Sequence, residues 1–386
     1  MRKNFKMLAK TLYGMEELLA DELRQLGASA VETGTRNVTF EGDTGFMYKA
    51  NLCCRTAIKI LKPITAFNVF NEDDLYRKIY DLRWEEHMDE NGSLAVDATV
   101  FSKQFTHSQF VSLKTKDAIV DRFRDKTGTR PDVDLDHPSL RINIHIDRNI
   151  CTVSLDSSGA SLHKRGYKTE TTLAPINEVL AAGMIMLSGW TGQCDFMDPM
   201  CGSGTILAEA AMIACNIPPN LNRDEFGFET WPDFDPDLYE VIENAALKKI
   251  KDFHFKIYGF DKDAIAVKKA KQNIKNANLQ EFIEIRTRDF FESEKESNRQ
   301  LHLVFNPPYD ERLSVSDIFE FYANIGNTLK RGYPGSNAWM ITSNMEALKN
   351  VGLRPSKKIK LYNGKLESRF VRYELYEGSR KAKKNI

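Results

Sequence analysis

The segment CDFMDPMCGSGTILAEAAMIAC, residues 194–215, joins a short apolar run, a glycine-rich turn and an apolar stretch with helical spacing. This order predicts a buried strand that leads through a tight turn into a helix. Gly202 and Gly204 permit unusual backbone conformations and let a ligand approach the chain closely. The helix start offers amide N–H groups without helical partners. The turn therefore suits either a ligand or close packing of the helix on the strand.

The turn differs from common nucleotide-binding loops. It is not GxGxxG, and it lacks the lysine of a phosphate-binding loop. A nicotinamide site would also need an acidic residue about 20 positions later. The next such strand end, GFDKD with Asp261, lies much further on, after an apparent inserted loop that carries Phe226, Phe228 and Trp231.

Strand and helix patterns alternate from residue 176 to residue 343. Predicted strands lie at 194–200, 255–260, 282–290, 301–305 and 337–343, and predicted helices at 176–190, 204–215, 264–279 and 317–332. Such alternation is typical of a parallel, doubly wound α/β sheet. Two further strands, 358–364 and 369–376, have no helix between them, so an antiparallel hairpin is expected to close the sheet.

Residues 1–160 show a different pattern, which predicts two small α+β units. The first unit, residues 1–69, holds a strand at 4–11, a helix ending at Gly27, two short strands at 28–42 and a helical stretch at 46–61. The second, residues 70–160, holds helices at 72–82 and 108–128, a strand at 93–101 and a hairpin at 140–159. A polar connector, residues 160–175, leads into the α/β part.

Charge is balanced overall, with 54 basic and 54 acidic side chains. The distribution is uneven, because residues 354–386 hold eleven Lys or Arg against three Glu. This basic end is interpreted as a phosphate-binding face or as a solvated tail.

The six cysteines lack CxxC spacing and the seven histidines lack ligand spacing, so we expect no metal and a reduced, cytoplasmic setting. The sequence contains no apolar run of about 18 residues, so it predicts no membrane span. Its N-terminus has no apolar signal segment.

Several polar residues follow the predicted parallel strands, where ligands of open α/β sheets bind. Asp261 suits the hydroxyls of a ribose, with a helix N-cap as its alternative role. Asp289, in TRDF, suits an adenine amino group, with a turn or cap as its alternative. The predicted cofactor-binding residues are Asp198, Pro199, Gly202, Gly204, Thr205, Asp261, Asp289 and Asn306.

The segment LHLVFNPPYDERL, residues 301–313, ends a predicted buried strand abruptly. Prolines cannot donate to a sheet ladder, so the strand is expected to stop at Asn306. Asn306, Pro307 and Tyr309 are the predicted catalytic residues. The alternative is a rigid loop with a packing tyrosine.

The motifs DPMCGSGT, GFDKD, RDF and NPPYDERL stand in the order found in class I S-adenosylmethionine-dependent methyltransferases. NPPY resembles the branch that methylates exocyclic amines of adenine or guanine. With HKRGYK and FGFETW added, the chain resembles the THUMP-containing RNA guanine-N2 methyltransferases, especially those acting on 23S ribosomal RNA.

The resemblance implies a ferredoxin-like unit over 1–69, a THUMP RNA-binding unit over 70–160 and a Rossmann-like methyltransferase domain over 161–386. It implies S-adenosylmethionine as cofactor and structured RNA, with 23S ribosomal RNA expected, as partner. In that family the similar part is the N-terminal half of a longer, two-activity protein, so we expect the second activity to be absent.

In the implied mechanism, the side-chain carbonyl of Asn306 and the backbone carbonyl of Pro307 accept the two N–H groups of the target amine. Tyr309 stacks on the base. Lys164, Arg165 and Tyr167 of the connector either contact cofactor or RNA or form a solvated linker. Glu178 is expected to reach the cofactor.

Three alternatives stay open from the sequence. The substrate is either ribosomal RNA or tRNA, and NPPY alone does not separate guanine N2 from adenine N6 of DNA. A non-catalytic RNA-binding module is the third, and binding of S-adenosylmethionine would argue against it.

Overall fold

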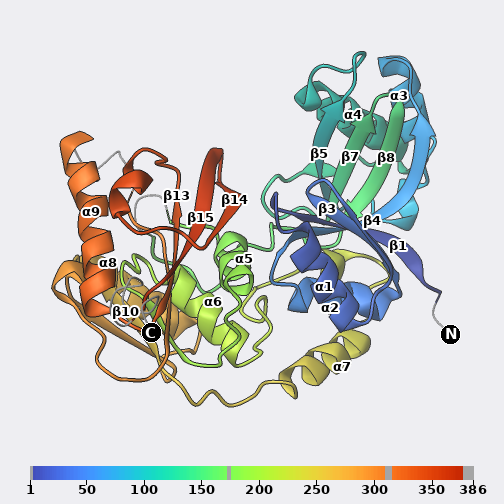
Figure 1. The fold of residues 1–386 in the computed structure, drawn as a ribbon. Helices are drawn as coiled ribbons and strands as arrows, with labels where there is room; N and C mark the ends of the chain where they lie inside the picture. Colours follow the sequence, from blue (N-terminus) through green and yellow to red (C-terminus); the bar gives the residue numbers. More distant parts are fainter. Residues whose placement is uncertain (1–2, 172–174, 309–314, 377–386) are drawn as a thin grey trace. The chain divides into compact units, whose positions relative to one another are not determined.

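The computed structural model describes residues 3–171, 175–308 and 315–376. The chain forms two compact units, each built from separate stretches (Figure 1). The first unit contains Met1–Thr11, Leu19–Lys164 and Arg223–Ala245. The second contains Leu12–Leu18, Arg165–Asn222 and Ala246–Ile386.

The first unit is built on one eight-stranded sheet with the order β2-β3-β1-β4-β8-β7-β5-β6. Its strands are β1 (Phe5–Thr11), β2 (Ser29–Gly34), β3 (Asn37–Gly42), β4 (Ala57–Asn68), β5 (Ser93–Phe101), β6 (Asp132–Val133), β7 (Leu140–Asp147) and β8 (Ile150–Asp156). Its helices are α2 (Thr44–Cys53), α3 (Glu72–Tyr80), η1 (Trp84–Glu86) and α4 (Ser108–Thr127), and α1 (Glu16–Leu26) begins at its boundary.

Strand β4 corrects the prediction of a helix over residues 46–61. The helix ends at Cys53, and Ala57–Asn68 forms a strand that pairs antiparallel with β1 on one side and β8 on the other. Ile58, Ile60 and Thr65 are β-branched and favour this extended backbone. The two predicted α+β units therefore share one continuous sheet.

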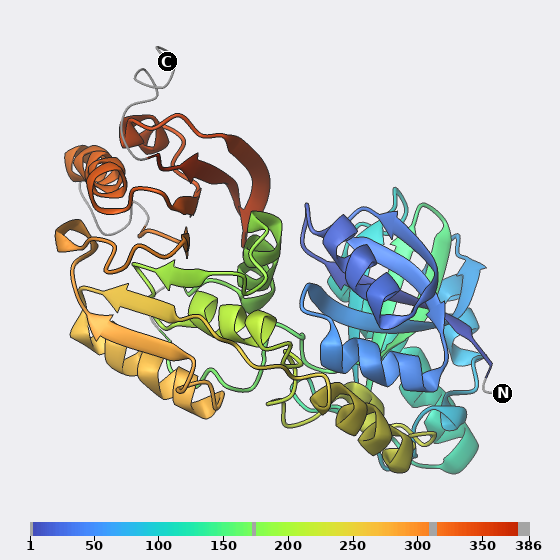
Figure 2. The ribbon, with the colours of Figure 1, turned by 60° about the horizontal axis from the view of Figure 1, so that its bottom comes forward.

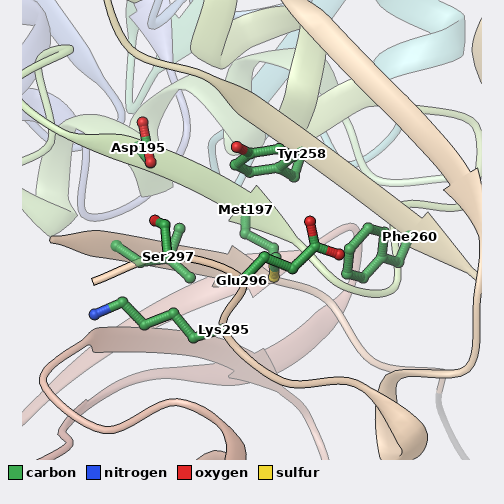
Figure 3. Close-up of a pocket in the computed structure, with 8 residues that line it drawn as sticks. Asp195, Met197, Tyr258, Phe260, Lys295, Glu296 and Ser297 are labelled. Carbon is green, nitrogen blue, oxygen red and sulfur yellow. The ribbon is translucent and has the colours of Figure 1, made fainter. Parts of the chain in front are cut away.

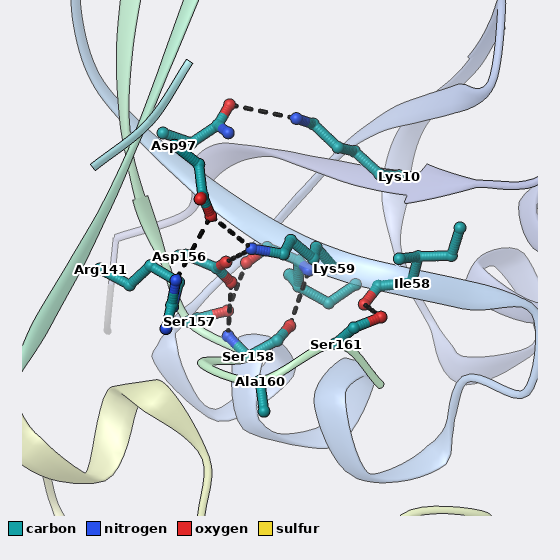
Figure 4. A network of polar contacts seen from close by, with 12 residues as sticks. Lys10, Ile58, Lys59, Asp97, Arg141, Asp156, Ser157, Ser158, Ala160 and Ser161 are labelled. Carbon is teal, nitrogen blue, oxygen red and sulfur yellow. Dashed lines mark hydrogen bonds and ion pairs between the residues drawn. The ribbon is translucent and has the colours of Figure 1, made fainter. Parts of the chain in front are cut away.

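Polar contacts reinforce the seam between β4 and its neighbours (Figure 4). The Lys59 ammonium lies 2.6 Å from the buried Asp156 carboxylate of β8 and 3.0 Å from Asp97 of β5. Arg141 of β7 lies 3.6 Å from the same Asp97 carboxylate. These ion pairs link β4 to three strands that follow it in the sheet.

The segment Arg223–Ala245 folds with the first unit although it lies within the α/β part of the sequence. It carries η2 (Gly227–Thr230) and the start of α7 (Pro236–Leu247). The Phe228 ring is buried and stacks on Tyr48 of α2 with a centroid distance of 4.3 Å. Phe226, Phe234 and Tyr239 complete this aromatic cluster.

The second unit holds a seven-stranded sheet with the order β11-β10-β9-β12-β13-β15-β14 (Figure 2). Its strands are β9 (Asp195–Asp198), β10 (Ile257–Asp261), β11 (Ile283–Thr287), β12 (Leu301–Phe305), β13 (Asn337–Thr342), β14 (Lys357–Asn363) and β15 (Leu366–Glu374). Its other elements are α5 (Glu178–Ser188), α6 (Thr205–Ala214), α8 (Ala264–Asn276), η3 (Phe290–Glu292), α9 (Val315–Gly332) and η5 (Ala347–Val351).

This topology confirms the predicted doubly wound sheet and its closing hairpin. Strands β9 to β13 are parallel, whereas β15 is antiparallel to β13 and to β14. Adjacent residues of β10 face opposite sides of the sheet. Gly259 faces Leu207 of α6, and Phe260 belongs to the apolar cluster that includes Tyr322 and Leu329 of α9. Helices therefore cover both faces.

No described helix is long and apolar enough to cross a membrane. No group of three or more His, Cys, Asp or Glu side chains in the same residues is arranged to hold a metal ion.

We predict that Phe228→Ala destabilises the first unit by about 3–5 kcal/mol, because it removes a buried ring from the aromatic cluster. Urea unfolding of the full chain measures the loss in free energy of unfolding. Hydrogen exchange of peptides from the first unit shows whether the loss lies in that unit. Val241→Ala on α7 is the matched control, since Val241 is 63% exposed. Equal effects of the two substitutions would show that the cluster does not stabilise the unit.

Candidate active site

The site lies where the strand order of the second sheet reverses. From β9 the chain proceeds outward through β10 and β11, and then returns to the other side of β9 with β12. Ligands of open α/β sheets bind at the carboxyl ends of strands at such a reversal. Asp198 and Asp261 are the last residues of β9 and β10, and Asn306 directly follows β12.

The glycine turn after β9 is held by a carboxylate from β10. The Gly202 amide donates to Asp261 Oδ2 over 3.0 Å, and the Asp263 amide donates to Asp261 Oδ1 over 3.0 Å. Gly202 and Gly204 have φ values of +52° and +83°, which other residues rarely adopt. The Asp261 carboxylate thus fixes a turn whose glycines would otherwise leave it conformationally free.

Helix α8 packs closely against the same turn. A Cβ atom on Gly204 would lie 3.2 Å from Ala270 Cβ. Thr205 begins α6, and its buried Oγ1 has no hydrogen-bond partner among the described residues. The close packing of α8 confirms the packing interpretation of this turn, and its role in binding a ligand stays a prediction.

Asp198 is buried beside this turn and accepts a hydrogen bond from the Met200 amide over 3.1 Å. Burial raises the pKa of its carboxyl well above the usual value, the Met200 bond opposes the rise, and the Asp261 carboxylate adds to it. Among the described residues neither carboxylate has an ion-pair partner. A cation bound beside these two acids would favour the ionised form of Asp198.

A helix-capping role was the alternative for both Asp261 and Asp289, and it holds for Asp289 only. Helix α8 is capped by Asp263, whose carboxylate accepts from the Ile265 amide, so Asp261 is not the N-cap. Asp289 caps η3, because its carboxylate accepts from the Phe291 amide over 2.8 Å. Asp289 lies after β11 as predicted, and its contact with an adenine stays a prediction.

Of the three predicted catalytic residues, the structure describes Asn306 and Pro307. Strand β12 is buried along its length and stops at Phe305, so Asn306 is the first residue beyond the ladder. Asn306 is half-buried and Pro307 is buried. Tyr309 lies outside the described residues, so its stacking role stays a prediction.

The connector is not a solvated linker at Arg165 or Tyr167, both of which are buried. Arg165 Nε donates to Glu209 of α6 over 3.2 Å, and its Nη1 donates to Asn220 over 3.1 Å. Lys164 is exposed.

Glu178 forms a 2.9 Å ion pair with Lys168, and its expected contact with the cofactor stays a prediction. The sequence does not predict the roles of Glu209 and Lys168, because no local motif marks their pairing with Arg165 and Glu178.

A separate pocket lies near the amino ends of the same strands (Figure 3). Asp195 and Leu301 begin β9 and β12, and both line it together with Lys295 and Glu296. Met197 and Phe260, which directly precede Asp198 and Asp261, line it as well, but Asp198, Asp261 and Asn306 do not.

We predict that Asp198→Asn stabilises the ligand-free protein at neutral pH. A carboxyl whose pKa is raised on folding contributes less stability as the pH increases above its unfolded value of about 3.9. The amide retains the acceptor for Met200 but carries no charge. Melting temperatures at pH 4 and pH 7.5 test this. The stability gain should be larger at pH 7.5, and an equal gain at both values would contradict the buried charge.

Comparisons with known proteins agree with this geometry. Residues 165–372 match the family model "RMKL-like, methyltransferase domain", residues 69–156 match "THUMP domain", and residues 6–61 match "RlmL ferredoxin-like domain". The ribosomal RNA large subunit methyltransferase K/L of Syntrophotalea carbinolica is 38% identical over 96% of the chain. The chain spans about half of that relative, 54% of its length.

Two further relatives match over nearly their whole length. The "Putative RNA methyltransferase slr0064" of Synechocystis sp. is 36% identical, with 94% of this chain and 95% of that protein aligned. The crystal structure of SMU.472, described as "a putative methyltransferase complexed with SAH", superposes with a TM-score of 0.86, 29% identity and coverage of 98% and 100%. The family resemblance is thus confirmed, and the chain belongs to the RMKL-like methyltransferases that carry a THUMP domain and a ferredoxin-like domain.

Proposed function

We propose that this chain transfers a methyl group from S-adenosylmethionine to the exocyclic N2 amine of a guanine in 23S ribosomal RNA. The observation that carries the proposal is the meeting of two features at one sheet reversal. These are the glycine turn held by Asp261 and the strand end at Asn306. The names of the K/L relatives and the complex of SMU.472 with SAH support it.

The residues at the turn fit the proposed cofactor. Each Asp261 oxygen accepts one backbone N–H and retains a lone pair, so the carboxylate can accept from two ribose hydroxyls. A positively charged cofactor would favour the ionised form of the buried Asp198 carboxyl and would lie beside the Asp261 carboxylate. Thr205 Oγ1 offers a further hydroxyl. When bound, S-adenosylmethionine supplies an electrophilic methyl group.

Asn306 and Pro307 would bind the target amine. A guanine amine is planar and weakly nucleophilic, because its lone pair is delocalised into the ring. Two carbonyl oxygens that accept its N–H groups bind it more strongly as positive charge grows on nitrogen. That difference between ground state and transition state accelerates the reaction. Alignment of the reacting atoms contributes about 7–11 kcal/mol in favourable cases.

Recognition of folded RNA requires a wide surface for backbone contacts. The THUMP domain within residues 69–156 supplies one such surface. The exposed Lys357 and Lys358 of β14 supply a second set of cations for phosphates. A cytoplasmic ribosomal RNA is the proposed partner, and tRNA is the nearest alternative.

Mass mapping of methylated nucleosides in RNA from cells lacking this protein tests the substrate. Loss of one N2-methylguanosine from 23S ribosomal RNA is the expected result. Loss of the same nucleoside from tRNA, or of N6-methyladenosine, would replace the proposed substrate. An unchanged pattern would favour a binding module.

We predict that Asp261→Ala weakens S-adenosylmethionine binding by roughly tenfold or more, because hydrogen bonds to a charged acceptor contribute about 1.5–3 kcal/mol each. Isothermal titration measures the affinity. Asp263→Ala is the matched control, since it removes the true cap of α8 and costs about 1 kcal/mol of stability. Similar affinities for the two variants would rule out a direct role of Asp261.

We predict that Asn306→Ala nearly abolishes methyl transfer while cofactor affinity is retained. Its side-chain carbonyl would contact the amine and not the adenosine. A tritiated-methyl assay beside isothermal titration separates these effects. Tyr309→Phe should retain far more activity than Tyr309→Ala, since stacking needs the ring. Substantial turnover by Asn306→Ala would refute the assigned contact.

A further inference from the structure

Asn273 of α8 is fully buried against the back of the glycine turn. Its Nδ2 donates to the Ser203 carbonyl over 3.0 Å and to the Glu170 carbonyl over 2.8 Å. Its Oδ1 accepts from the amides of Thr169 and Glu170, over 3.2 and 3.1 Å. One side chain thus makes four hydrogen bonds to the backbones of two segments.

The connector around residue 170 is held to the second unit at other points as well. Asn276 donates to the Tyr167 carbonyl over 3.1 Å and to Thr169 Oγ1 over 2.9 Å. Lys168 binds Glu178 of α5. Of these contacts, only those of Asn273 also reach the glycine turn.

The turn needs such an anchor because of its glycines. Ser203 stands between Gly202 and Gly204, both with positive φ, so the chain on each side has wide conformational freedom. Asp261 fixes the amide of Gly202, and Asn273 fixes the carbonyl of Ser203. The bond from β10 and the bond from α8 thus restrain the two peptide groups that flank the Gly202–Ser203 peptide.

We infer that Asn273 is a positioning residue of the cofactor site, which sets the glycine turn and couples it to the connector at Thr169 and Glu170. This inference rests on the proposed function, since it assumes that the turn holds S-adenosylmethionine. An amide is the side chain that suits the position, because it donates to carbonyls on one side and accepts from amides on the other.

Three variants of the full chain separate this role from simple stability. Asn273→Asp retains the acceptor for the connector amides but loses the donors to the Ser203 and Glu170 carbonyls. Asn273→Ala removes all four bonds without adding a charge, and serves if the Asp variant does not fold. Asn276→Ala removes the connector contacts with Tyr167 and Thr169, and a bond from Gln272 of the same helix, but no contact with the glycine turn. Isothermal titration with S-adenosylhomocysteine gives the affinity, and hydrogen exchange of residues 199–206 reports on the ligand-free turn.

The Asp and Ala variants of Asn273 should lose roughly tenfold or more in affinity, as expected for buried hydrogen bonds that position a ligand site. They should also exchange faster at residues 199–206, whereas Asn276→Ala should change neither quantity. Wild-type affinity in the Asn273 variants, or an equal loss in Asn276→Ala, would overturn the inference alone. Failure of the wild-type protein to bind would overturn the proposed function with it.

Discussion

The hydrogen bond from the Gly202 amide to the Asp261 carboxylate is the contact on which the site depends. Parallel strands bring their loops to one edge of the sheet, but they do not fix the shape of a loop that contains two glycines. Asp261 fixes it and places a negative charge beside the buried Asp198. The site therefore has a defined shape and an electrostatic cost that a cationic ligand would offset.

Much of the second unit could be predicted from the sequence because its signals are local. Apolar runs alternate with helical periodicity, and the prolines after Asn306 end β12 where expected. The placement of Asp198, Asp261 and Asn306 at adjacent strand ends followed from the parallel topology. The pair β14 and β15 could be predicted from the missing helix between them.

Other features depend on contacts that are distant in sequence. The helix predicted over 46–61 is wrong from Ala57 onward, where the chain forms β4. Pairing of β4 with β1 and β8 favours the extended backbone there. Arg165 stands in a polar stretch that is typical of a solvated linker, yet it is buried. Its hydrogen bonds to Glu209 and Asn220 offset the cost of burying its charge. Asn273 lies 104 positions from Thr169 and has no local signature. Such roles become visible only when partners are known.

The segment Arg223–Ala245 folds with the first unit, and this has a consequence for folding during protein synthesis. The ring of Tyr48 lacks its stacking partner Phe228 until residues 165–222, which belong to the second unit, have been made. At translation rates of about 5–20 residues per second, this delay lasts on the order of 3–12 s. The nascent first unit therefore carries an uncovered aromatic surface during that interval. The sheet of the first unit is made by residue 156, but the unit can bury this aromatic cluster only after Arg223–Ala245 has been made.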